Sequence, residues 1–309
     1  MTNDPTIKWL LEGDVSIQYQ VFRDLLNTEQ PDLQQRIATE GWGQVLLSKR
    51  LSNGHWGRSF YQPKWTSSHY TLLELKNLAI DPFVPEIRQT VDLIIRNEKC
   101  TDGGINPVGG TKVSDVCING MFLNYASYFR VPEAQLKSVV DFLIAQQMPD
   151  GGFNCHSNRK GAVHSSLHTT LSVLEGILEY SRNGFSYQLK KMNQMTREST
   201  EFILQHHLYK SDKTALVIDE KMTRFSYPCR WRYDVLRALD YLQDARLSYD
   251  CRMDDAMELL LRKRKGERKW LLQAKHSGQA HVDMEIVGKP SRWNTLRAMR
   301  VLKHFGFDK

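Results

Sequence analysis

A short apolar segment recurs about every fifty residues, and this repetition constrains the fold more than any other feature of the chain. Ser68–Leu78 aligns without a gap with Leu167–Ile177, Arg232–Leu242 aligns likewise with Arg292–Leu302, and Val116–Leu123 fits the same pattern. These segments are apolar around much of their circumference, which indicates helices covered on several sides. We call the equivalent position the slot; its residues, 48 to 65 positions apart, are Tyr19, His69, Cys117, His168, Tyr233 and Trp293.

A second, amphipathic helix is predicted before most of these inner helices, for example around Val139–Ile144 and Met257–Leu261. Glycine-rich turns at Asn53–Gly57, Asp102–Asn106 and Asp150–Asn154 separate the outer helix from the inner one. Asp-Gly-Gly supplies a side-chain cap and residues that accept positive φ, so the chain can reverse tightly. Each repeat is therefore predicted to be a helical hairpin.

One such hairpin cannot bury its apolar face alone, whereas stacked hairpins can. Six hairpins can close into a ring with the inner helices around a central cavity. The sequence therefore predicts an all-α fold, an (α/α) toroid of about six helical hairpins that forms one domain over residues 1–309.

Composition excludes several classes of function. The net charge of +7 is spread along the chain apart from Arg262–Lys265, which favours a small anionic substrate over nucleic acid. The sequence contains no run of about 18 apolar residues, which is the pattern that predicts a membrane span. Met1–Pro5 does not resemble the start of a signal peptide. The five cysteines are odd in number and widely spaced, which favours free thiols and a cytoplasmic location.

The turns Gln147–Phe153 and Asn53–Gly57 resemble the repeats shared by squalene cyclases and the β subunits of protein prenyltransferases. The cyclase branch implies an Asp-x-Asp-Asp acid motif, which this sequence lacks. The nearest match, Met253–Ala256, begins a predicted outer helix and is better explained as N-terminal capping. A cyclase that starts its reaction by protonation is therefore disfavoured.

The prenyltransferase branch implies a zinc ion held by Asp115, Cys117 and His168, which would then be the catalytic residues. Asp115-Val116-Cys117 follows a glycine turn, and His168-Thr169 begins the next inner helix, as in that family's pattern. Lys112 matches a lysine that binds diphosphate in the family. Two residues depart from the pattern: Gly109 stands where the family has arginine, and Ile118 where it has tyrosine. A partner subunit is not visible in one sequence.

The same three residues make chemical sense without the resemblance. Carboxylate, thiolate and imidazole are ordinary zinc ligands, and three protein ligands leave a position for substrate. Cys155 in the neighbouring turn is a further candidate ligand or nucleophile, and His164 is a candidate support for His168. Each residue also has an ordinary structural explanation: a buried thiol, a helix-capping Asp115 or a core histidine.

We expect these residues to serve a zinc-dependent enzyme that acts on an isoprenoid or other small anionic substrate in an aromatic-lined central cavity. Aromatic walls suit apolar groups, and arginines suit carboxylates or phosphates. Two alternatives stay open: a non-catalytic toroid that binds a peptide or partner protein, and a carbohydrate-active (α/α) barrel. The expected substrate-binding residues are Lys64, Trp65, His69, Lys112, Cys155, Arg230, Arg232, Tyr233, Arg292 and Trp293.

Overall fold

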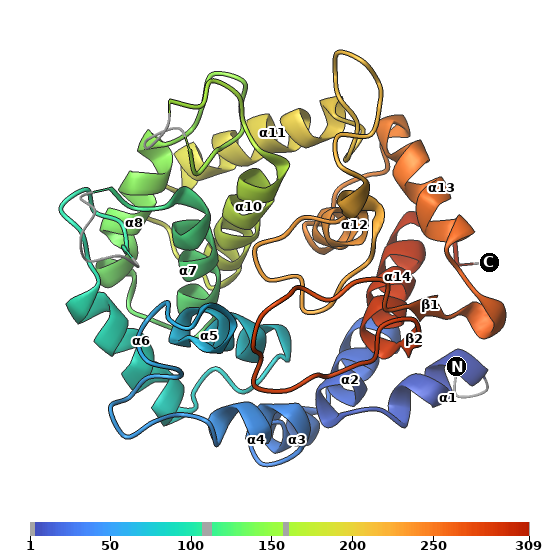
Figure 1. Cartoon of the computed structure of the whole chain (residues 1–309), viewed down its shortest axis with the longest axis horizontal. Coiled ribbons are helices and arrows are strands. Elements are labelled where there is room, and N and C mark those ends of the chain that lie inside the picture. Colours follow the sequence, from blue (N-terminus) through green and yellow to red (C-terminus); the bar gives the residue numbers. More distant parts are fainter. Residues whose placement is uncertain (1–3, 107–112, 157–160, 309) are drawn as a thin grey trace. The chain divides into compact units, whose positions relative to one another are not determined.

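The computed structural model describes residues 4–106, 113–156 and 161–308. The structure is 54% helix (Figure 1). Within the described residues the named strands are β1 (Trp270–Leu271) and β2 (Pro290–Ser291), which pair antiparallel. The predicted all-α class is therefore confirmed. No helix in this described part is long and apolar enough to cross a membrane.

The chain divides into two compact units. Unit 1 comprises Met1–Lys49, Asn77–Asp81 and His206–Lys309, and unit 2 comprises Arg50–Lys76 and Pro82–Gln205. The expectation of one domain over residues 1–309 stays a prediction, and so does the closure of the helical hairpins into a ring.

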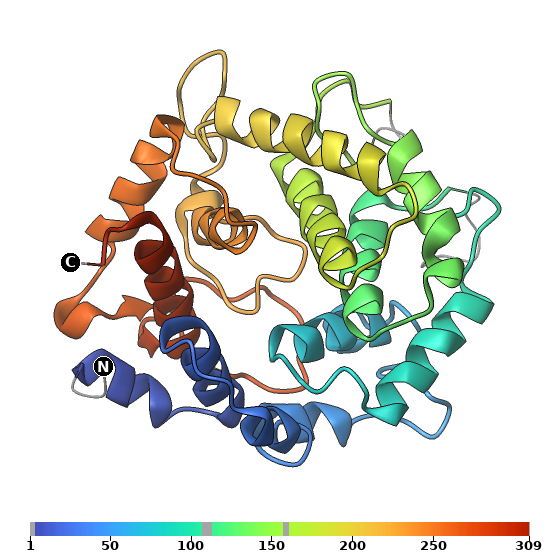
Figure 2. The same cartoon turned by 180° about the vertical axis from the view of Figure 1, so that it is seen from behind.

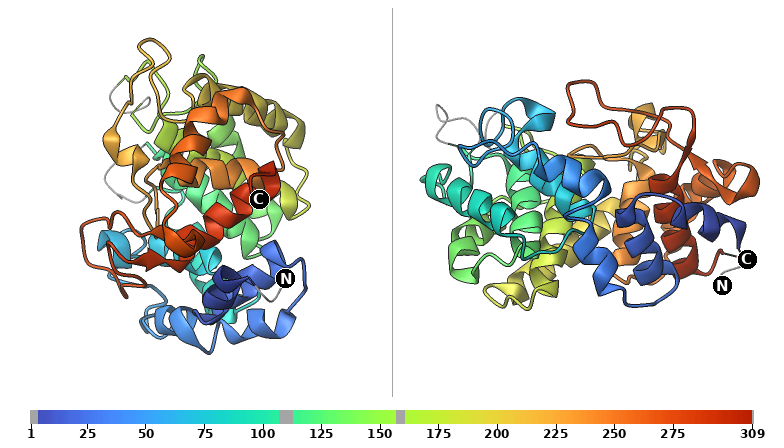
Figure 3. Two further views of the ribbon diagram at one scale, coloured as in Figure 1. Left: turned by 90° about the vertical axis from the view of Figure 1, so that its right-hand side faces the viewer. Right: turned by 90° about the horizontal axis from the view of Figure 1, so that it is seen from below.

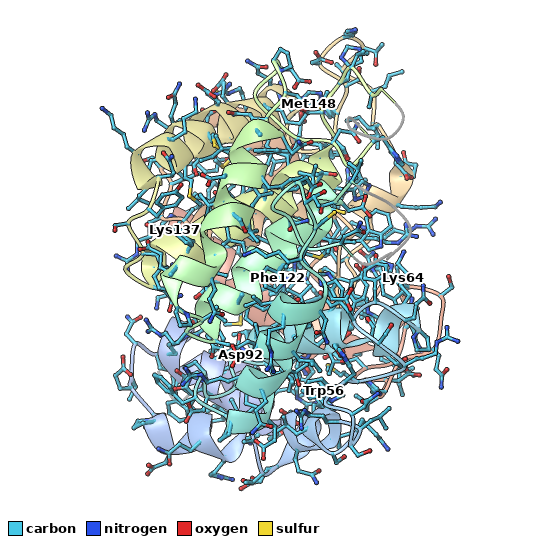
Figure 4. All side chains as sticks on the ribbon, turned by 90° about the vertical axis from the view of Figure 1, so that its left-hand side faces the viewer. Trp56, Lys64, Asp92, Phe122, Lys137 and Met148 are labelled. Atoms are coloured by element: carbon cyan, nitrogen blue, oxygen red, sulfur yellow. The ribbon has the colours of Figure 1, made fainter. Side chains whose placement is uncertain are left out.

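Unit 2 has two layers of helices. The inner helices lie side by side, and the outer helices cover one side of them (Figures 1 and 2). Figure 4 shows this covering: Asp92 and Lys137 lie on outer helices, whereas Phe122 lies on an inner helix and is fully buried. The inner helices are α5 (Ser68–Asn77), α7 (Val116–Tyr128) and α10 (Leu167–Arg182), and the outer ones are α6 (Pro85–Asn97), α8 (Glu133–Ala145) and α11 (Leu189–Gln205). A short helix, η2 (Lys64–Thr66), precedes α5.

The predicted Asp-Gly-Gly turns each hold the chain at the start of an inner helix. Asp150 accepts hydrogen bonds from the backbone N–H of Ser165 (2.8 Å) and from its hydroxyl, just before α10 begins. Gly151 has a φ of +89°, which explains why glycine is needed there. Asp102 binds Ser114 in the same way, with distances of 2.7 and 2.8 Å, before α7. The turns therefore fix where the inner helices start.

In unit 1, α14 packs against α2, η1 and α12. Both α12 and α14 are amphipathic helices whose buried faces supply leucines, such as Leu239 and Leu296, to the core. The helices of this unit are α1 (Pro5–Leu11), α2 (Val15–Gln20), η1 (Val21–Leu25), α3 (Pro31–Arg36), α4 (Gly41–Leu47), η3 (Glu220–Thr223), α12 (Val235–Asp244), η4 (Cys251–Met253), α13 (Asp254–Arg262), η5 (Gly266–Arg268) and α14 (Arg292–Phe305).

The two ends of the described chain meet within unit 1 (Figure 3). The guanidinium of Arg268 donates a hydrogen bond to the carbonyl of Asp308 (2.8 Å) and lies 3.6 Å from the carboxylate of Asp4. The hydroxyl of Thr6 donates to the carbonyl of Glu267 (2.9 Å). Helix α1 is therefore tied to the segment that leads into β1.

A network of two carboxylates and two arginines joins η1, α12 and α14. Asp240 accepts hydrogen bonds from Arg297 (3.2 Å) and Arg300 (2.9 Å), and Arg300 also donates to Asp24 (2.8 Å). The Arg297 side chain is 5% exposed, and those of Arg300, Asp24 and Asp240 are 16% exposed. Because these charges have lost most of their contact with water, the attraction between them must offset the cost of burying them.

This network predicts that unit 1 loses stability in acid. Burial raises the pKa of Asp24, but the charges and hydrogen bonds of Arg300 and Arg23 outweigh it, so the pKa lies below the ordinary value. A carboxyl with a lowered pKa stabilises the folded state above its unfolded-state pKa, and this stabilisation is lost as the pH falls through the folded-state value. We expect the urea concentration at the unfolding midpoint to decrease as the pH is lowered below about 4. The decrease should be less steep in Asp24→Asn. Equal slopes in the two proteins would contradict this explanation.

Candidate functional site

Two cysteines from separate elements of unit 2 lie against each other. Cys117 is the second residue of α7, and Cys155 follows the turn between α8 and α10. The backbone N–H of Cys117 donates a hydrogen bond to the sulfur of Cys155 (3.0 Å). The hydroxyl of Thr169 in α10 approaches the same sulfur (3.5 Å) and accepts from the backbone N–H of Cys155 (3.3 Å). Both cysteines are free and half-buried.

The fold brings this pair together through the repeated turn. The backbone N–H of Phe153 donates to the hydroxyl of Thr170 in α10 (2.9 Å), which fixes the segment that carries Cys155. In the preceding repeat, the N–H of Ile105 donates to the side-chain oxygen of Asn119 in α7 (2.7 Å). Both inner helices are thus anchored at their first turn, and Cys155 is held at the N-terminal end of α7.

The surroundings shift the pKa values of the two thiols in opposite directions. The interaction with the Cys155 thiol, together with burial, raises the pKa of Cys117 well above its ordinary value. The same interaction, helped by Thr169 and by the N–H of Cys117, lowers the pKa of Cys155 although burial opposes the shift. The N-terminal end of a helix also favours negative charge. Cys155 is therefore the better thiolate of the two.

Asp115 and Tyr61 are neighbours of the thiol pair. Asp115 is the N-cap residue of α7, but its side chain makes no capping hydrogen bond. Burial raises the pKa of Tyr61, and the nearby Cys117, Asp115 and Cys155 raise it further, although a hydrogen bond with Tyr70 lowers it. Tyr61 is thus a neutral hydroxyl beside two thiols and a carboxylate.

Tyr61 connects this site to a cluster of aromatic rings around His69. The Tyr61 and Tyr70 hydroxyls are 3.0 Å apart, and Nδ1 of His69 lies 3.3 Å from the hydroxyl of Tyr125. The His69 ring is fully buried among these tyrosines and Phe60, with ring centroids 4.8 to 5.6 Å away. Burial lowers the pKa of His69 to about 3, so its ring is neutral at physiological pH.

The hydrogen bonds of the turns revise the alignment that placed His69 in the slot. Trp56 N–H donates to Ser68 (3.0 Å), as Phe153 donates to Thr170 and Trp270 to Thr295 (3.0 Å). Ser68 therefore corresponds to Asn119, Thr170 and Thr295, each two residues after the slot. By these bonds, Thr66 corresponds to the slot in this repeat, three residues before His69. His69 is nevertheless the second residue of α5, as His168 is the second residue of α10, so its place in the slot stays a prediction.

The structure brings together part of the predicted zinc set. Asp115 and Cys117 lie beside each other with Cys155, whereas His168 is a half-buried residue at the second position of α10. In residues 4–106, 113–156 and 161–308, no three His, Cys, Asp or Glu side chains are placed to hold a metal ion. Asp115, Cys117 and His168 are thus not assembled into a metal site in this arrangement, and zinc binding stays a prediction. Lys112 lies outside the described residues.

Of the other residues predicted in unit 2, Trp65 is buried and Lys64 is exposed, with its ammonium 4.8 Å from the Trp65 ring centre. This cation–π contact accounts for the position of Lys64 without a ligand.

In unit 1, the predicted arginines gather around the loop before α12. Arg230 is buried, and the guanidinium of Arg232 lies 4.8 Å from the ring centre of Trp231. Burial and the charges of Arg232 and Arg230 lower the pKa of His276 to about 4. Tyr233 is buried just before α12, with its hydroxyl bound to the carbonyl of Leu208. Arg230 and Arg232 thus form a positively charged cluster. The hydroxyl of Tyr233 instead holds the backbone of Leu208.

Trp293 and Arg292 begin α14. The Trp293 ring stacks on Tyr227, with centroids 4.4 Å apart and planes 13° apart. Arg292 donates to the carbonyl of Trp9 (3.0 Å) and lies over the Trp9 ring. Glu285 accepts the backbone N–H of Arg292 (2.6 Å) and so caps the helix. Arg292 therefore anchors α1. A cavity lined by residues from both units stays a prediction.

An open groove of about 520 Å³ lies in unit 2 between the 147–151 turn and α11. Met148, labelled in Figure 4, lines it together with Glu198. Glu198 accepts hydrogen bonds from Gln147 (2.9 Å) and Gln194 (2.8 Å), and Asp150 is engaged by Ser165. The groove's carboxylates thus have structural partners, so they give no support to a sugar-cleaving carboxylate pair.

Sequence reasoning missed Tyr61, Thr169 and Tyr125. Thr169 adjoins His168 in the quoted motif, and its side-chain role was detectable only from the turn's geometry. Tyr61 lies in an irregular loop and carries no periodic signal.

Comparisons with known proteins do not extend this description. No protein-family model matches the chain, and no curated protein matches it. Two solved structures of variants of the type II terpene cyclase MstE from Scytonema are similar. One, in complex with merosterolic acid A, has 11% identity and a TM-score of 0.38 over 97% of this chain and 98% of the other. The second, in complex with geranylgeranyl dihydroxybenzoate, has 12% identity and a TM-score of 0.36 over 97% of each chain. At these scores the likeness carries no argument.

Proposed function

We propose that this protein is an enzyme that acts on a small molecule through the thiol of Cys155. The observation that carries the proposal is the convergence of hydrogen bonds on one sulfur. The Cys117 N–H (3.0 Å) and the Thr169 hydroxyl (3.5 Å) both donate to it, at the N-terminal end of α7. Thiolates stabilised in this way are nucleophiles, provided that reagents can reach them. Cys155 is partly exposed.

The neighbouring side chains support an apolar substrate with a polar reacting group. Tyr61 offers a neutral hydroxyl beside the sulfur, and its ring continues into the cluster with Tyr70 and His69. Asp115 adds a carboxylate close to the two thiols. An isoprenoid is the substrate that the sequence resemblance implies.

The finer form of this proposal is a zinc-dependent transfer enzyme. Zinc would activate the thiol or polarise the substrate, with Asp115, Cys117 and His168 as ligands. This form rests on the resemblance and on the ligand types in the sequence, so no step of the reaction is derived through the metal. Elemental analysis of protein purified without a metal-affinity tag tests it. About one zinc per chain, lost in Cys117→Ala, would support it, and no zinc after supply and washing would leave the thiol proposal without a metal.

Alkylation tests the thiol proposal directly. We expect iodoacetamide at pH 7 to modify Cys155 about tenfold faster than the exposed Cys251, because the surroundings of Cys155 lower its pKa and favour its thiolate. Peptide mass spectrometry of timed samples gives both rates from one protein. Thr169→Val should slow Cys155 several-fold and leave Cys251 unchanged. Thr196→Val, which removes a hydroxyl bound to Met192 in α11, is the matched control. Equal rates at Cys155 and Cys251 would contradict the proposal.

A further inference from the structure

The structure holds a second thiol, that of Cys117, close to the proposed nucleophile. Cys117 and Cys155 are 38 residues apart and belong to different elements. The Cys155 sulfur lies 3.0 Å from the backbone nitrogen of Cys117. A nucleophilic cysteine does not require a second cysteine beside it.

This geometry is compatible with a disulfide. A disulfide needs Cα atoms about 4.4 to 6.8 Å apart. Bonds of about 1.5 Å separate a backbone nitrogen from its Cα. A sulfur 3.0 Å from that nitrogen therefore keeps the two Cα atoms within about 7 Å of each other, which is the outer limit for bridging. The Cys155 sulfur thus lies within reach of the Cys117 side chain.

The other cysteines lack this arrangement and serve as internal controls. Cys229 is buried and donates its thiol proton to the carbonyl of Ser226 (3.1 Å). Cys251 is exposed at the start of η4, and Cys100 precedes the turn that begins at Asp102. Cys229 and Cys251 belong to unit 1, whereas the pair belongs to unit 2.

We propose that Cys117 and Cys155 form a reversible disulfide, which makes this pair a redox modification site. The oxidant is a low-molecular-weight disulfide. The Cys155 thiolate attacks one of its sulfurs, the S–S bond breaks, and one thiolate leaves with a proton from solvent. Cys117 then loses its proton and attacks the Cys155 sulfur, which releases the second thiol. Two protein thiols are oxidised to one disulfide, and one disulfide is reduced to two thiols.

The same surroundings make the bond easy to reduce. The Cys117 N–H and the Thr169 hydroxyl bind the Cys155 sulfur in the reduced protein. Interactions that stabilise the reduced form raise the reduction potential. The disulfide would tie the start of α7 to the segment after Phe153 and remove the nucleophile. This inference stands whether or not Cys155 is catalytic, since it depends only on the pair.

Equilibration of the full-length protein with reduced and oxidised glutathione tests the proposal. After acid quenching and alkylation, peptide mass spectrometry should find one disulfide between Cys117 and Cys155, which dithiothreitol reverses. Cys251→Ser should behave like the parent. Cys117→Ser should accumulate a mixed disulfide of glutathione on Cys155, because no second thiol resolves it. A parent protein that carries glutathione on Cys155 without the internal bond, or that remains fully reduced in oxidised glutathione, would overturn the proposal. Neither result depends on any enzymatic activity.

Discussion

Replacement of Asp240 by alanine should lower the free energy of unfolding by about 3 kcal/mol, the scale measured when one partner of a buried ion pair is removed. Asp240 is the carboxylate shared by Arg297 and Arg300, which come from α14 (Figure 2). Arg300 retains Asp24 in the variant, whereas Arg297 keeps long contacts to Ser226 (3.4 Å) and Asn294 (3.5 Å) and the nearby charge of Asp234. The loss of the carboxylate paired directly with a guanidinium that is 5% exposed is the main source of the destabilisation.

Urea unfolding followed by circular dichroism measures this effect. Glu40→Ala is the control: Glu40 pairs with Arg36 at 2.8 Å on the surface, where both side chains are nearly half exposed. Surface pairs of this kind contribute little, so this variant should unfold like the parent. If Asp240→Ala were no less stable than Glu40→Ala, the buried network would not be what joins α12 to α14.

Local chemistry decided which features could be predicted from the sequence. The Asp150-Gly151-Gly152 turn was predicted because its carboxylate, its positive φ and its place before an inner helix depend on adjacent residues. The inner helices were predicted because they are apolar on most sides. The two-residue strands β1 and β2 carry no such pattern, since too few residues alternate.

The candidate site was predictable only in part, because its contacts join residues far apart in the chain. Cys117 and Cys155 were both singled out, but the contact between their thiols depends on how α7 packs on α10. His69 was aligned with His168 by its letters, whereas the hydrogen bond from Trp56 to Ser68 reveals a three-residue offset. Arg292 resembled a ligand-binding residue, but its partner, Trp9, is 283 residues away.

Close packing of α7 on α10 has a consequence that side-chain chemistry alone does not predict. Gly176 and Gly120 face each other across these helices, and a Cβ on Gly176 would lie 2.4 Å from the carbonyl oxygen of Gly120. A Cβ on Gly120 would lie 2.7 Å from the carbonyl oxygen of Ser172. Both obstacles are backbone atoms, so the helices themselves must move apart to admit a methyl group.

Gly176→Ala should therefore destabilise the protein by about 2 kcal/mol, since overpacking costs more than alanine's helix propensity returns. Gly266→Ala is the control, because a Cβ at this position would meet nothing within 4 Å and alanine should be neutral or slightly stabilising there.

The double variant Gly120→Ala/Gly176→Ala should cost less than the sum of the single changes, because one separation of α7 from α10 accommodates both methyl groups. Chemical denaturation of the parent, Gly120→Ala, Gly176→Ala and the double variant measures this coupling. Strict additivity would mean that each methyl group is accommodated locally, and the alkylation rate of Cys155 would then be unaffected. Non-additivity with a slower Cys155 would link the packing of the two helices to the thiol site at their N-terminal ends.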